Sequence, residues 1–107
     1  MDARFRRVTE AIKAKGKEIL PEGSSITLFG SRARGDARED SDWDIHILIP
    51  GPETLSLSEM GDYSLPFMEL GLEINEDIEP LVYTFKGWEK RWFLPLFINI
   101  REEGIPL

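Results

Sequence analysis

The segment Trp43–Ile49 constrains the fold more than any other part of the sequence. It reads Trp-Asp-Ile-His-Ile-Leu-Ile, so every second residue is large and apolar. Side chains of a β-strand alternate between the two faces of a sheet, and this period therefore predicts a strand with one fully apolar face. The other face carries Asp42, Asp44, His46 and Leu48. Such a strand is expected in the interior of a sheet that buries one face against helices.

The remaining segments predict helices and strands that alternate along the chain. Amphipathic spacing indicates a helix over residues 2–20, and a run of β formers indicates a strand over Ser25–Phe29. The further expectations are a loop with a helical turn (30–40), a partial helix that Pro66 breaks or starts (56–72), a third strand (78–85), and one or two helices (88–103). This order predicts an α/β (α+β) fold, a small mixed β-sheet flanked by helices. Its length of 107 residues predicts a single domain over 1–107.

Composition excludes several classes of function. The formal charge is -7, from 20 acidic and 13 basic residues, which disfavours broad nucleic-acid binding. There is no cysteine, so disulfides and thiolate metal sites are excluded. The first twenty residues lack the apolar core of a signal peptide, and no stretch is long enough to cross a membrane. The default expectation is a cytoplasmic protein without membrane attachment.

A turn after the first predicted strand has the features of an anion site. Gly30 permits a sharp turn and close approach of a phosphate, while the Ser31 hydroxyl and the following backbone N–H groups can form a cradle. Arg32 and Arg34 add positive charge in an acidic chain. The alternative interpretation is an ordinary strand-to-helix turn with exposed arginines.

The two aspartates of the second strand predict a metal site. Asp42 and Asp44 are separated by one residue, so both carboxylates project from the same face, roughly 6–7 Å apart at the backbone. Two like charges so placed repel each other unless a cation lies between them, and Mg²⁺ prefers oxygen ligands and bridges carboxylate to phosphate. The alternative is a solvated strand end, with Ser41 and Asp42 as turn or cap residues.

Together these segments resemble a known family. Leu-Phe-Gly-Ser-Arg-Ala-Arg-Gly at 28–35 and Ser-Asp-Trp-Asp-Ile at 41–45 resemble the minimal nucleotidyltransferases of the DNA polymerase-β-like superfamily, whose signature is Gly-Ser, ten residues, then Asp-x-Asp. The resemblance implies a polymerase-β-like core, a nucleoside triphosphate donor expected to be ATP, and Mg²⁺. It assigns Gly30 and Ser31 to the triphosphate, with Arg32 and Arg34 beside them, and Asp42 and Asp44 to the metal.

A third carboxylate is also implied by the resemblance, and Glu79 is the candidate for metal binding and for accepting the proton of the acceptor hydroxyl. Pro80 follows it, removes a ladder donor and indicates an edge strand. Asp77 lies on the same predicted strand face and is the alternative. An exposed acid with no function on an edge strand is the remaining interpretation.

Partners and competing functions follow from the same resemblance. Minimal nucleotidyltransferases occur as antitoxins that modify a tyrosine of a helical HEPN-type toxin, so such a partner, or a homo-oligomer, is expected. The competing hypothesis is a catalytically degenerate nucleotide- or partner-binding module of the same fold. An aminoglycoside-type transferase is disfavoured because the chain lacks a second domain. His46 is interpreted as a satisfied, partly buried residue, and most aromatic residues of the 88–97 segment as core, with one row left exposed.

Overall fold

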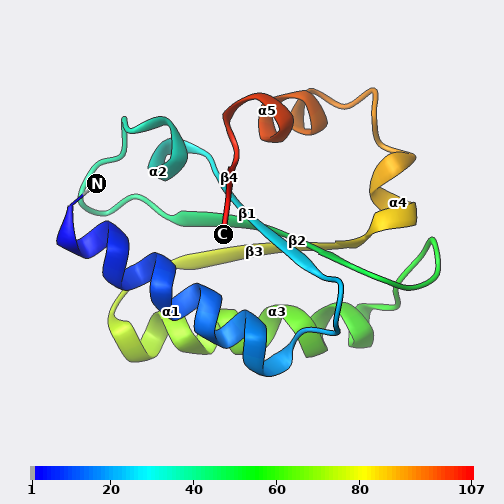
Figure 1. Cartoon of the computed structure of the whole chain (residues 1–107), viewed down its shortest axis with the longest axis horizontal. Coiled ribbons are helices and arrows are strands. Elements are labelled where there is room, and N and C mark those ends of the chain that lie inside the picture. The colour runs from blue at the N-terminus through cyan, green and yellow to red at the C-terminus, as the bar shows by residue number, and fades with distance from the viewer. Residues whose placement is uncertain (1) are drawn as a thin grey trace.

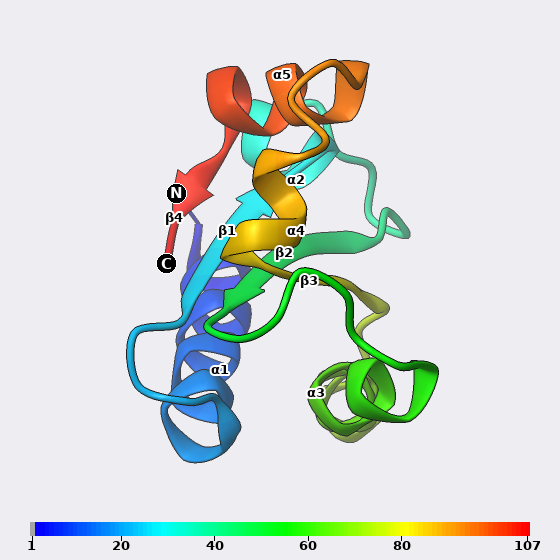
Figure 2. The ribbon, with the colours of Figure 1, turned by 90° about the vertical axis from the view of Figure 1, so that its right-hand side faces the viewer.

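A computed structural model describes residues 2–107, whose helices and strands follow the predicted order. Helices α1, α3 and α5 span Ala3–Ile19, Leu57–Ile74 and Pro95–Glu103, and the short helices α2 and α4 span Ser31–Arg34 and Phe85–Glu89. Strands β1 to β4 span Ser25–Phe29, Trp43–Ile49, Ile78–Thr84 and Ile105–Pro106. Figures 1 and 2 show α1 and α3 on one side of the sheet and α2, α4 and α5 on the other. Within residues 2–107, no helix combines the length and the apolar character that crossing a bilayer requires.

The sheet is mixed, as predicted, and its strand order is β3-β2-β1-β4. Strand β1 is antiparallel to β2, with Phe29 opposite Asp44, and β3 is parallel to β2, with Glu79 opposite Asp44. The end of β1 therefore meets the beginnings of β2 and β3 at one end of the sheet. Strand β2 lies in the interior, and β3 with its Pro80 forms an edge, so both sequence-based expectations are confirmed.

The core lies between the sheet and the pair α1 and α3. The apolar face of β2 is buried there, and Leu28 of β1 lies in the same core. Val8 and Ile12 of α1 and Phe67 of α3 are fully buried against it. Burying a large apolar side chain contributes about 1.5–3 kcal/mol. The period-two pattern of β2 thus fixes which face of the sheet is packed and which remains for polar residues.

Two expectations are corrected. Pro66 neither breaks nor starts a helix but lies inside α3, which a capping box of Ser56 and Glu59 begins and Asn75, in the left-handed region at φ 59°, ends. The loss of one helical hydrogen bond at Pro66 is offset by these caps and by the burial of Phe67 and Leu70. The strand at 78–85 ends one residue earlier, because the Thr84 hydroxyl accepts from the Gly87 N–H (2.9 Å) and caps α4. Strand β4 was not predicted.

A buried carboxylate ties α1 to the strands. Glu76, which lies just before β3, accepts hydrogen bonds from Arg4 Nε and Nη2 at 2.9 and 2.7 Å and from Trp43 Nε1 at 3.1 Å. The Arg4 side chain lowers the pKa of Glu76. Arg4 Nη2 also donates to the Glu39 carbonyl at 2.8 Å, so the same pair anchors the loop before β2.

Replacing Glu76 by glutamine is expected to lower the free energy of unfolding by about 1–3 kcal/mol, because Arg4 loses its charged acceptor. Urea or thermal denaturation measures the change. The control is Glu10→Gln, which removes an exposed acid paired with Lys13 at 3.7 Å; its effect should stay within about 0.5 kcal/mol. Equal stability of both variants would contradict a structural role for the Glu76 carboxylate.

Candidate functional site

The turn at Gly30 joins β1 to α2 in a conformation that requires glycine. Its φ and ψ are 74° and -158°, a region that L residues essentially never adopt. The Asp44 carboxylate also lies against the Gly30 Cα, so a Cβ at position 30 would overlap Asp44 Oδ2. The register that places Phe29 opposite Asp44 produces this contact. The predicted anion cradle and the second aspartate are therefore direct neighbours.

Backbone donors at the start of α2 face away from the helix. The Ala33 N–H donates to the Gly30 carbonyl at 3.0 Å, so helical bonding begins there. The N–H groups of Ser31 and Arg32 precede it and have no intrahelical acceptor. Ser31 is half-buried beside them. Two N–H groups and one hydroxyl can thus donate hydrogen bonds to an anion at this turn.

A carboxylate from the other end of the chain reaches the same turn, and no local pattern in the sequence predicts this contact. Glu103, at the end of α5, accepts from the Gly30 N–H at 3.2 Å and from Arg34 Nη1 at 3.3 Å. Arg34 also donates to Asp36 at 3.2 Å. Glu103 therefore orients the turn and holds Arg34 beside it.

Arg32 has a different environment from Arg34. Its guanidinium lies 4.5 Å from the centre of the Trp43 ring and donates to the carbonyls of Glu39 and Ser41 at 3.0 and 2.8 Å. These contacts hold the loop that leads into Asp42. In this structure the Arg32 side chain therefore fixes the backbone that positions Asp42.

Three carboxylates converge at the beginnings of β2 and β3. Asp42, Asp77 and Glu79 are exposed, and one oxygen of each lies within 4.8 Å of the others. The backbone explains the convergence, because the Trp43 N–H donates to the Asp77 carbonyl at 2.8 Å where the parallel pairing begins. Both candidates for the third acid thus lie in this acidic cluster. The nearby Asp77 carboxylate raises the pKa of Asp42.

Asp44 lies between the acidic cluster and the Gly30 turn. It is half-buried, and burial, followed by the neighbouring Asp42, raises its pKa. A cation would relieve this crowding of like charges. Asp42, Asp77 and Glu79 offer carboxylate oxygens within 4.8 Å of one another, close to the ~4–5 Å between opposite ligands of one hard cation, whereas Asp44 lies outside this set. The residues therefore fit a hard divalent ion.

His46 lies on the same sheet face but serves as packing. Its side chain is buried, its ring lies 4.2 Å from that of Trp88, and burial lowers its pKa to about 4. It is therefore neutral at neutral pH. Its side chain is more completely buried than the expected partly buried residue, and within residues 2–107 its Nε2 atom has no hydrogen-bond partner from the protein. Trp88 stacks on Phe97 with centroids 5.1 Å apart, whereas Trp92 and Phe93 are exposed.

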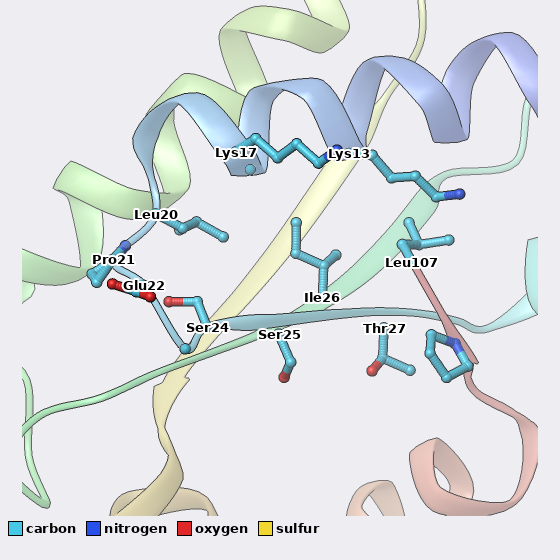
Figure 3. A pocket seen from close by; sticks show the side chains of 13 residues that line it. Lys13, Lys17, Leu20, Pro21, Glu22, Ser24, Ser25, Ile26, Thr27 and Leu107 are labelled. Atoms are coloured by element: carbon cyan, nitrogen blue, oxygen red, sulfur yellow. The ribbon is translucent and has the colours of Figure 1, made fainter.

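A separate cavity of about 630 Å³ opens between α1 and β1. Figure 3 shows Lys13 and Lys17 above it, and Leu20, Ile26 and Leu107 around its apolar part. None of the acidic-cluster residues lines it. This cavity is therefore a different feature from the site at the beginnings of β2 and β3.

Comparison with known proteins gives two similarities. Residues 6–105 match the nucleotidyltransferase domain family. Among solved structures, a chain from a crystal structure of a toxin-antitoxin with AMP-PNP has a TM-score of 0.63 at 18% identity. The alignment covers 91% of this chain and 69% of that one, which establishes similarity of fold. No curated protein is significantly similar in sequence.

Proposed function

The chain belongs to the nucleotidyltransferase domain family, and we propose that it transfers a nucleoside monophosphate from a nucleoside triphosphate to a hydroxyl acceptor, with release of pyrophosphate. One observation carries the proposal: the Asp44 carboxylate touches the Gly30 turn while Asp42, Asp77 and Glu79 converge beside it. A phosphate at the turn would therefore lie next to a set of oxygen ligands.

The donor is held at the Gly30 turn. The N–H groups of Ser31 and Arg32 and the Ser31 hydroxyl supply hydrogen bonds to phosphate oxygens, and Arg34 supplies charge. The Arg32 side chain acts as a positioning group, because it binds the loop before Asp42. The AMP-PNP bound in the structurally similar toxin-antitoxin supports ATP as the donor.

Asp42 and Asp44, with Glu79 or Asp77, would hold Mg²⁺. When bound, the ion would neutralise charge on the phosphates and on the attacking and leaving oxygens. Asp44 suits a position between the metal and the triphosphate because its carboxylate contacts the Gly30 turn, where the triphosphate is proposed to bind. Asp42 suits the acceptor side, where Asp77 and Glu79 lie.

In the proposed reaction the acceptor oxygen attacks the α-phosphorus, a new P–O bond forms, and the bond to the β-phosphate oxygen breaks. The proton of the acceptor hydroxyl passes to a carboxylate, and Glu79 is proposed for this role. Glu79 is exposed on the edge strand β3, where an acceptor has open access. The protein's contribution to the reaction rate therefore comes mostly from positioning the two substrates and neutralising the charge of the phosphates.

The acceptor is proposed to be a hydroxyl of a partner protein, a tyrosine of a HEPN-type helical toxin, with this chain as the antitoxin. The solved toxin-antitoxin of similar fold supports this choice. A degenerate binding module is the second candidate. It is favoured by one observation, that Glu103 already accepts from the Gly30 N–H and binds Arg34.

The experiment that tests transfer combines the chain, Mg²⁺, each of the four nucleoside triphosphates, and proteins co-purified from the native host. Intact mass spectrometry then looks for a protein that gains one nucleoside monophosphate. The proposal expects this adduct together with pyrophosphate release. Triphosphate binding without any adduct would instead support the binding module.

Glu79→Gln is expected to lower turnover by about 10²–10⁴-fold and to change triphosphate affinity little, because the cradle holds the donor and Glu79 acts on the acceptor. Asp77→Asn is the matched comparison, since both acids lie in the acidic cluster. Single-turnover rates and nucleotide titrations measure the two effects. If Glu79→Gln keeps full activity while Asp77→Asn is inactive, Asp77 and not Glu79 accepts the proton of the acceptor hydroxyl.

A further inference from the structure

The outer face of α3 carries apolar side chains that no other part of residues 2–107 covers. Leu57, Leu65, Met68 and Leu72 are 86, 53, 45 and 83% exposed. Their spacing of eight, three and four residues places them on one side of the helix, away from buried Phe67. We refer to these four residues as the α3 ridge. Isolated exposed leucines are ordinary, but four large apolar residues exposed on one side of one helix are typical of an interface.

Acidic residues run beside this ridge. Glu59, Asp62, Glu69 and Glu73 lie on the adjoining side of α3, and the helix contains no lysine or arginine. The surface therefore combines an apolar row with an acidic side that carries no basic residue. Its charge complement is a row of lysines or arginines beside an apolar stripe. The same negative charge disfavours anionic lipid as the occupant.

The C-terminal end of the α3 ridge leads to the acidic cluster. Met68 and Leu72 line a cavity of about 470 Å³ whose other walls include Ser41 and Asp77. Asp77 belongs to the acidic cluster. A molecule seated on the ridge would therefore reach the rim of the site where an acceptor hydroxyl must arrive.

We infer that the outer face of α3 docks a basic amphipathic helix of the protein that carries the acceptor hydroxyl. The acceptor part of this inference rests on the proposed function; the docking part does not. The ridge extends over about 22 Å of helix. A single-file row of this length fits the apolar stripe of one helix, with basic residues facing the acidic row.

The test measures binding without any reaction. The probe is a fluorescent peptide as long as α3, with leucines at helical spacing beside a row of lysines; a second peptide carries glutamates in place of the lysines. The basic peptide should bind the intact chain and the acidic one should not. Leu65→Ser with Leu72→Ser should weaken binding of the basic peptide about tenfold or more. Both positions are exposed, and circular dichroism would verify that the variant is folded.

Matched controls separate docking from general attraction to an acidic protein. Trp92→Ser removes an exposed aromatic residue outside α3 and should leave affinity unchanged. Glu69→Gln with Glu73→Gln should weaken binding and its salt dependence more than Glu10→Gln with Glu18→Gln, which removes the same charge from α1. Equal losses in ridge and control variants would overturn the proposed surface.

Three further outcomes are decisive. If sedimentation shows a dimer of the chain alone that Leu65→Ser with Leu72→Ser dissolves, the occupant is a second copy and the inference is wrong. If the peptide binds as expected while no acceptor is modified in the mass-spectrometric assay, docking stands and the transferase proposal fails. If transfer to a partner occurs with unchanged efficiency in the ridge variant, the transferase stands and the docking site fails.

Discussion

Replacing Asp42 and Asp44 together by asparagine is expected to abolish nucleotide transfer and to leave the protein folded. The two carboxylates are the proposed main ligands of the metal, and asparagine keeps their shape but removes their charge. A loss of about 10³-fold or more follows if they neutralise the transition state. Stability should not fall, because neighbouring acids and burial raise the pKa values of both groups, so their charges repel in the folded protein.

The measurement combines a transfer assay with thermal unfolding of the native protein and of the Asp42, Asp44 variant. Glu39→Gln with Asp40→Asn is the matched control, because it removes two exposed acids from the preceding loop. Glu39 binds Arg4 and Arg32 through its backbone carbonyl, which the substitution leaves in place, so the loop remains anchored in this variant. The control should retain activity. Full transfer by the Asp42, Asp44 variant would end the metal hypothesis.

The parts of the site that lie close in sequence could be predicted, because strand period and spacing determine them. Alternation in β2 placed Asp42 and Asp44 on the face opposite the core, and the glycine turn before them lies at the end of the neighbouring strand. The pairing of β3 with β2 was not predicted and comes from the structure. Whether Asp77 or Glu79 would approach Asp42 was open, since it depends on a register that no local pattern specifies. The structure brings both together.

Contacts between distant segments could not be predicted. Glu103 reaches Gly30 across 73 positions of sequence, and its residue type alone does not distinguish it from other exposed acids. Arg32 was expected beside the phosphate, but its actual neighbours follow from how the loop before β2 folds back over Trp43. Pro66 was misjudged for a related reason. Local propensity disfavours proline in a helix, whereas burial of Phe67 and strong caps outweigh that preference.

Gly30→Ala is expected to abolish nucleotide transfer, because the new side chain displaces Asp44. It should also lower the free energy of unfolding. Two effects combine at this position. The backbone conformation of Gly30 is essentially restricted to glycine, which costs about 1–3 kcal/mol for alanine. The new Cβ would also overlap Asp44 Oδ2 and displace the carboxylate that joins the cradle to the acidic cluster. A shift of this kind near the reacting groups reduces turnover by about 10²-fold or more.

Gly35→Ala provides the control that separates strain from displacement. Gly35 also has a positive φ, 85°, but nothing lies within 4 Å of the place where its Cβ would be. This variant should lose about 1 kcal/mol of stability and keep most of its activity. A double-mutant cycle then isolates the clash: Asp44→Ala removes the overlapping atoms, so Gly30→Ala should destabilise that background less than the native one. If Gly30→Ala costs the same stability in both backgrounds, or if Gly35→Ala loses transfer to the same extent, the contact between Gly30 and Asp44 is not what makes glycine necessary at this turn.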